Sequence, residues 1–159
     1  MRRACILMVA CLLAVAVSVP LAHAATKHRV SGTLRAVTFS TSGTPPAAGS
    51  KVVDVGTLKT RPGGAGAVIL SATFLTSPSP GTYPLTGTGK AFYQHGTLSF
   101  KFAQTATLQP NGSVNYAGKG TITGGTDTFS GARGKFTFTG SAAAPASAET
   151  LKVTGSVIY

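Results

Sequence analysis

Alternation of apolar and polar residues is the feature that most restricts what this chain can fold into. In the clearest run, Leu98, Phe100 and Phe102 alternate with polar neighbours, and Phe136 and Phe138 do the same further along the chain. A period of two residues is that of a β-strand with one buried face, and no window after residue 24 shows the 3.6-residue period of an amphipathic helix. The sequence therefore predicts an all-β protein.

Clusters of Gly, Pro, Ser and Asn separate these runs and signal turns. Together they predict eight strands, over 29–39, 52–61, 66–76, 87–94, 97–108, 113–123, 133–140 and 149–159. An even number of antiparallel strands with mostly short connections favours a closed up-and-down β-barrel, which leaves no exposed edge. A β-sandwich is the alternative. Glycines inside strand patterns mark bends or close approaches and favour the barrel; these are Gly118, Gly120, Gly134, Gly140 and Gly155.

The first 24 residues have the pattern of a cleavable secretory signal peptide. Two arginines precede an apolar run, and Ala22-His23-Ala24 fits the small-x-small rule of signal peptidase. The run is shorter than the ~20 residues that a helix needs to span a bilayer, which disfavours a retained anchor. We therefore expect cleavage between Ala24 and Ala25, a single domain over 25–159, and a secreted, periplasmic or cell-surface location.

Residue types that carry chemistry are few after residue 24. Both cysteines lie in the first 24 residues, the acids are Asp54, Asp127 and Glu149, and the imidazoles are His28 and His95. Nucleophilic catalysis needs a nucleophile, a base and an orienting group, and a zinc site needs three or four ligands. We therefore expect no catalytic residue, no metal and no bound cofactor. His95 is predicted in a solvated turn, and His28 near a loose chain end.

Without Arg2 and Arg3, twelve Lys and Arg face three acids, a net charge of +9 with His neutral. Such a surface attracts anionic partners, and an anionic cell-envelope surface is a candidate. The cations are spread over the whole chain without a basic stripe and interleaved aromatics. We therefore expect no nucleic-acid partner, and solubility alone would explain the charge.

A motif near the end of the chain reads G-G-T-D-T-F-S-G-A-R-G over 124–134. It resembles the G-G-T-G-x-F-x-x-A-x-G signature with which the allene oxide cyclase and dirigent barrel families turn one strand into the next, with Asp127 in place of the usual Gly. The resemblance implies an eight-stranded antiparallel barrel, often a homotrimer, that holds a small apolar guest and needs no cofactor. It carries no catalytic residue over to this chain.

Alternation within such a barrel assigns residues to faces. Lumen-facing candidates for ligand contact are Leu98, Phe100, Phe102, Phe136 and Phe138. The residues expected to build the structural turn are Gly124, Gly125, Phe129, Gly131 and Gly134. The glycines would admit φ above zero, and Phe129 would plug the base of the barrel rather than face a ligand. Arg133, Lys135 and Thr137 are expected to point outward.

Three functions remain open at this point. The leading one is a barrel that binds or shields a small apolar molecule, because eight strands leave either a filled interior or room for one small ligand. A cofactor-free cyclase or isomerase, or a dirigent-type coupling protein, is the alternative, and a carboxylate buried in the lumen would favour it. The third is a basic, envelope-associated structural protein.

Overall fold

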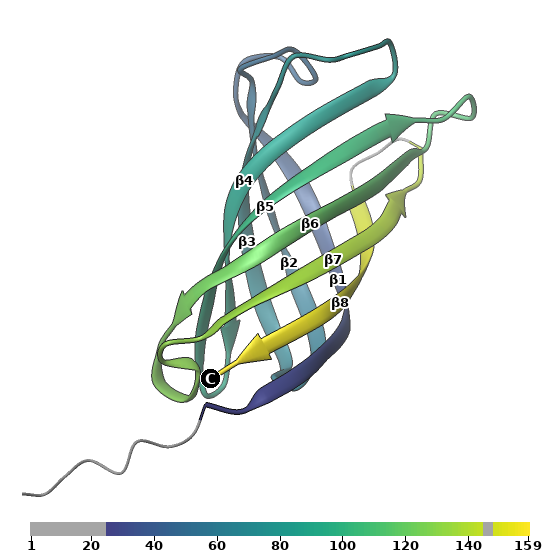
Figure 1. Cartoon of the computed structure of the whole chain (residues 1–159). Coiled ribbons are helices and arrows are strands. Elements are labelled where there is room, and N and C mark those ends of the chain that lie inside the picture. The colour runs from purple at the N-terminus through teal and green to yellow at the C-terminus, as the bar shows by residue number, and fades with distance from the viewer. Residues whose placement is uncertain (1–24, 145–147) are drawn as a thin grey trace, which may run out of the picture.

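The computed structural model describes residues 25–144 and 148–159, which form a closed barrel of eight antiparallel strands (Figure 1). In chain order these are β1 (Lys27–Ser42), β2 (Lys51–Arg61), β3 (Gly64–Phe74), β4 (Thr82–Tyr93), β5 (Gly96–Leu108), β6 (Val114–Gly125), β7 (Arg133–Ala142) and β8 (Ala148–Ile158). Each strand pairs with its neighbour in sequence, and β8 closes on β1. The predicted barrel is confirmed and replaces the sandwich alternative. The predicted signal peptide lies outside the described residues.

Strand β4 begins well before its predicted start, at Thr82 instead of position 87. Tyr83 and Leu85 continue the inward alternation of this strand. Pro84, whose ring removes a donor, points outward, and its carbonyl accepts a hydrogen bond from the backbone N–H of Leu75 at 2.8 Å. The proline therefore takes part in the pairing as an acceptor.

Glycines on the inner face lie where neighbouring backbone or rings come close. At Gly134, Gly140 and Gly155 an added Cβ would lie 2.0–2.3 Å from a carbonyl oxygen of an adjacent strand. At Gly118 and Gly120 it would meet an aromatic ring at 2.3 and 2.2 Å. These glycines mark close approaches, as expected for the strongly bent wall of a small barrel.

The connection between β6 and β7 holds the one helix of the described residues, the 3₁₀-helix η1 (Asp127–Phe129). Asp127 has a φ of 52°, in the left-handed region that Asp tolerates, and Gly131 has a φ of 69°. Both angles agree with the tight turn expected from the motif. Over the described ranges, no helix has the length and apolar character needed to cross a membrane.

The other glycines of the motif do not use positive φ, so that expectation is wrong for Gly124, Gly125 and Gly134. Close packing explains two of them instead. A Cβ at Gly125 would lie 2.5 Å from the carbonyl oxygen of Thr97, and one at Gly134 would lie 2.1 Å from that of Ser156. Gly124 has open space around it.

The start of the chain after residue 24 is held in the sheet, contrary to the expectation of a loose end. His28 pairs with Val157 of β8. Its ring stacks on Tyr159 with the two centroids 4.7 Å apart and an interplanar angle of 21°. The two ends of the barrel domain therefore lie side by side, at one end of the barrel (Figure 1).

Candidate functional site

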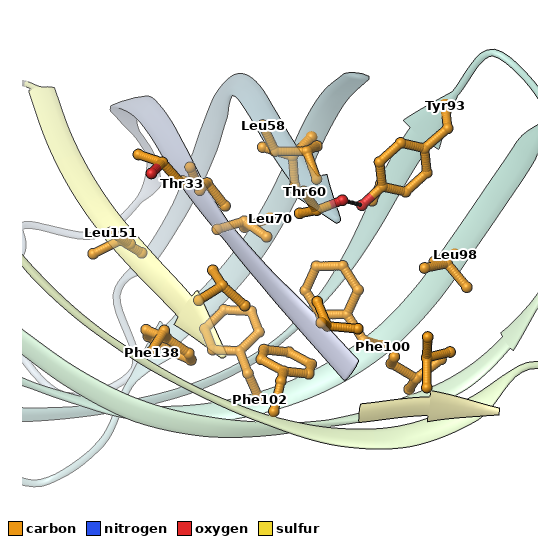
Figure 2. A pocket seen from close by; sticks show the side chains of 18 of the residues that line it. Thr33, Leu58, Thr60, Leu70, Tyr93, Leu98, Phe100, Phe102, Phe138 and Leu151 are labelled. Carbon is orange, nitrogen blue, oxygen red and sulfur yellow. Dashed lines mark hydrogen bonds between the residues drawn. The ribbon is translucent and has the colours of Figure 1, made fainter. Parts of the chain in front are cut away.

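The half of the lumen near the C-terminus contains an apolar cavity of about 90 Å³ (Figure 2). All eight strands and η1 contribute to its wall. The structure places all of the predicted lumen-facing residues in that wall: Leu98, Phe100, Phe102, Phe136 and Phe138. Their contact with a ligand stays a prediction.

The four phenylalanines fit inside the barrel because each ring lies over a glycine of the neighbouring strand. The cross-strand pairs are Phe100 with Gly89, Phe102 with Gly87, Phe136 with Gly120, and Phe138 with Gly118. A Cβ on any of these glycines would lie 2.2–2.7 Å from a ring atom of its partner. The rings therefore lie against the wall of the barrel instead of filling its centre.

Aromatic contacts also join the strands on either side of β6. The rings of Phe100 and Phe136 meet edge to face, with centroids 5.4 Å apart at 89°. Phe102 and Phe138 make a similar contact at 6.3 Å. Such edge-to-face pairs are a preferred arrangement of aromatic rings, so the aromatic wall is held in one geometry.

Phe129 closes the barrel at the end that carries the termini. Its side chain is buried, and its ring centroid lies 5.4 Å from that of Tyr93 and 5.0 Å from that of Tyr159. The hydroxyls of Tyr93 and Thr60 are hydrogen-bonded at 3.0 Å (Figure 2). Phe129 thus has the position expected of a plug, but its ring also forms part of the cavity wall, so it faces the lumen as well.

Two of the chain's three acids lie inside the barrel, in the half remote from the termini. Asp54 of β2 is 4% exposed and Glu149 of β8 is 5% exposed. Strand β1 separates them, and its Thr38, the cross-strand partner of Asp54, gives that carboxyl a side-chain hydrogen bond. Neither acid lines the apolar cavity.

Burial controls the ionisation of these groups. Burial first, and then the negative charge of Asp54, raise the pKa of Glu149 to about 8. Burial also raises the pKa of Asp54, while the hydrogen bond from Thr38 lowers it. Tyr116 of β6 has its pKa raised to about 12, first by burial and then by the two acids. At neutral pH Glu149 is therefore mainly the neutral carboxylic acid, which can donate a hydrogen bond or a proton.

Sequence reasoning named these acids but gave them no place in the lumen. The signal was present in the alternation, because Asp54 is in phase with Val52 and Leu58, and Glu149 is in phase with Leu151. Each acid occupies a position that an apolar residue would fill on the pattern alone.

The remaining chemistry-bearing residues lie apart from the buried acids. His95 is in the exposed turn between β4 and β5, as predicted, and Asp127 is exposed in η1, where it accepts a hydrogen bond from Thr126 at 2.8 Å. Within 25–144 and 148–159, no three His, Cys, Asp or Glu side chains cluster as a metal site would require.

Comparison with family models, with curated proteins and with solved structures found no match to this chain. The barrel agrees with the architecture that the resemblance to the allene oxide cyclase and dirigent families implies. Many unrelated proteins share such barrels, so this agreement establishes the fold and not the family.

Proposed function

We propose that this protein is a secreted barrel of the allene oxide cyclase and dirigent type that binds or shields a small apolar molecule in its lumen. The observation that carries the proposal is the aromatic cavity at the end of the barrel closed by Phe129. A core under selection for stability alone fills such space, because each void lowers stability. Here the rings pack against the glycines of the barrel wall, and the space at the centre stays open.

The dimensions of the cavity restrict the guest. An apolar cavity of about 150 Å³ stays dry and binds benzene, and the cavity here measures about 90 Å³. A guest held entirely within this cavity is therefore no larger than one small ring or a short hydrocarbon segment. Thr60, Tyr93 and Gln104 bring polar groups to the otherwise apolar wall, and such groups orient an oxygen on a bound molecule.

Benzene is a suitable first probe, followed by two-dimensional amide NMR of the full barrel domain. Ala91 is buried in the cavity wall, so Ala91→Leu places a larger side chain in the cavity. Ala103→Leu adds the same atoms on the exposed outer face of β5 and serves as the matched control. We expect saturable shifts at the cavity residues of the wild type and the control, and none in Ala91→Leu. Absence of saturable shifts in the wild type, or equal shifts in both variants, would contradict the proposal.

The buried carboxyls favour a second candidate function, that of a cofactor-free cyclase or isomerase. On this hypothesis the neutral carboxyl of Glu149 donates its proton to an oxygen of a guest that reaches beyond the apolar cavity, whose wall does not include Glu149. The carboxylate takes a proton back when the product forms. The proton is returned, so the reaction needs no oxidant or reductant. Burial, and then the charge of Asp54, raise the pKa of Glu149 and so keep its proton available at neutral pH.

A short-chain vinyl epoxide tests this second function, with its uncatalysed isomerisation as the reference. Loss of a positioned general acid typically costs ~10²–10⁴-fold in rate. We expect Glu149→Gln to lose the rate above background and Asp127→Asn, which changes an exposed acid, to keep it. Equal rates in the two variants, or no rate above background in the wild type, would rule the candidate out.

A further inference from the structure

The outer wall of the barrel carries a row of alternating cations and hydroxyls that runs across the strands. Following the register from β5 through β8 to β1, the cross-strand partners are Lys101, Thr121, Lys135, Ser156 and Arg29. We call these five residues the cation row. Neighbouring strands lie ~4.8 Å apart, so the cations repeat at intervals of ~10 Å.

The cation row crosses a groove on the outer face of β5 to β8, a wall that faces the viewer in Figure 1. The groove has a volume of about 620 Å³. Lys101, Lys119 and Lys135 stand around it with the hydroxyls of Thr121 and Thr137. It is a concave site lined by three lysines.

The chain offers no carboxylate to balance these ammonium groups on the wall. All three of its acids lie elsewhere, with Asp54 and Glu149 inside the barrel and Asp127 in η1. On an ordinary soluble surface, charges of both signs are interspersed. The groove therefore concentrates positive potential, and a concave surface of one sign raises the local concentration of the opposite ion.

We propose that this groove binds an acidic polysaccharide. The three cations of the row are spread over four strand spacings, too far for one phosphate or carboxylate to contact all of them, whereas a linear polymer with repeated charges can contact each of them. The hydroxyls of Thr121 and Ser156, which lie between the cations, offer hydrogen bonds to sugar hydroxyls. The two aromatic residues of the groove lining, Phe102 and Phe136, belong to the inner face of the wall and also line the lumen cavity. The cations and hydroxyls of the outer face therefore have no aromatic ring among them for the base stacking on which proteins that bind single-stranded nucleic acid depend. The site lies outside the lumen, so it does not rest on the lumen function.

Fluorescence anisotropy of labelled alginate oligosaccharides, at low salt and at about 0.15 M salt, measures the proposed binding. The groove variant is Lys101→Gln/Lys135→Gln. The matched control is Lys51→Gln/Lys59→Gln, which removes the same charge from exposed positions of β2, on the opposite wall of the barrel. Because two exposed ion pairs are worth roughly a two- to thirtyfold change in affinity, we expect a loss in that range in the groove variant and little change in the control.

Three results would overturn the proposal. Equal losses in the two double variants would mean that the polymer responds to overall charge and not to the groove. Alginate binding no stronger than that of labelled neutral dextran would remove the role of charge. Binding of a labelled oligothymidylate as tightly as alginate, with the same dependence on Lys101 and Lys135, would identify a nucleic-acid surface instead.

Discussion

Gly118 and Phe138 are cross-strand partners on β6 and β7, and the ring of Phe138 occupies the space that a Cβ at position 118 would need. The same relationship joins Gly120 to Phe136. An aromatic ring that covers a cross-strand glycine restores the contacts that the glycine lacks, a device also used in designed sheets. The glycines and the aromatic rings of the inner face are therefore paired, and these pairs determine the shape of the cavity.

Gly118→Ala should destabilise the barrel. The new Cβ would lie 2.3 Å from the ring of Phe138 and 2.7 Å from the carbonyl oxygen of Ala103, so ring and backbone must both shift. Overpacking of this kind costs ~1–3 kcal/mol. Gly124→Ala in the same strand is the control, because nothing lies within 4 Å of its Cβ position. Equal free energies of denaturant unfolding for the two variants would contradict the account of the glycines.

Phe129→Ala should cost about 3–5 kcal/mol of unfolding free energy, the range for truncation of a buried aromatic. The reason is its position between Tyr93 and Tyr159 at the closed end of the barrel. Arg133→Ala, at an exposed position that begins β7, should cost far less. A neutral Phe129→Ala in denaturant unfolding would mean that the β6–β7 connection is not a packing anchor.

Alternation predicted the strands and the inward direction of Leu98, Phe100 and Phe102 because a period of two fixes the face of every residue. The same rule places Asp54 and Glu149 inside. Acids are rarely buried without a partner, so the usual preference of this residue type opposes the positional signal. The face that the alternation assigns is nevertheless the correct one for both acids.

The sequence alone does not predict the register between neighbouring strands. The cation row depends on the pairing of Lys101 with Thr121 and of Thr121 with Lys135. The β5–β6 register also shifts between Ser99 and Phe100, and a shift of this kind changes which residues are neighbours. Because these lysines are far apart in the sequence, the sequence alone does not indicate that they form one row.

Secreted protein should begin at Ala25, as intact-mass measurement would show. The backbone N–H of Thr26 donates a hydrogen bond to the carbonyl of Tyr159 at 3.0 Å, and β1 starts at Lys27. Cleavage before Ala25 therefore leaves the β1–β8 closure complete. Ala24→Leu places a large residue in the small-x-small site and should reduce processing. Secreted material that still contains Leu21 would refute the predicted site.

The protein should form a homo-oligomer, a trimer by the family resemblance. Val37, Val55 and Ile69 are consecutive cross-strand partners on the outer wall of β1 to β3 and are 41–45% exposed. Contiguous exposed apolar surface of this kind marks interaction sites. We expect light scattering to give about three times the monomer mass, Val55→Lys to lower it, and Thr139→Lys on β7 to leave it unchanged. A monomeric wild type would contradict the prediction.

Stability should fall as pH rises from about 5 to 8, because of Glu149. The folded state holds its pKa at about 8, above the ordinary 4.5, so between these values the folded chain binds a proton that the unfolded chain has released. The stabilisation is therefore complete below the ordinary pKa and is lost as pH rises through the pKa of the folded state. Over the pH range in which the folded chain holds one proton more than the unfolded chain, the free energy of unfolding falls by about 1.4 kcal/mol for each pH unit. The raised pKa of Asp54 acts in the same direction, and Tyr116 stays protonated throughout.

Glu149→Gln keeps the shape of the side chain and removes its titration. We expect this variant to unfold at a higher guanidinium concentration than the wild type at pH 8, and its midpoint to vary less between pH 5 and pH 8. Asp127→Asn changes an exposed acid in η1 and should keep the wild-type dependence. An unchanged pH dependence in Glu149→Gln would mean that this carboxyl ionises freely, and the second candidate function would lose its proton donor.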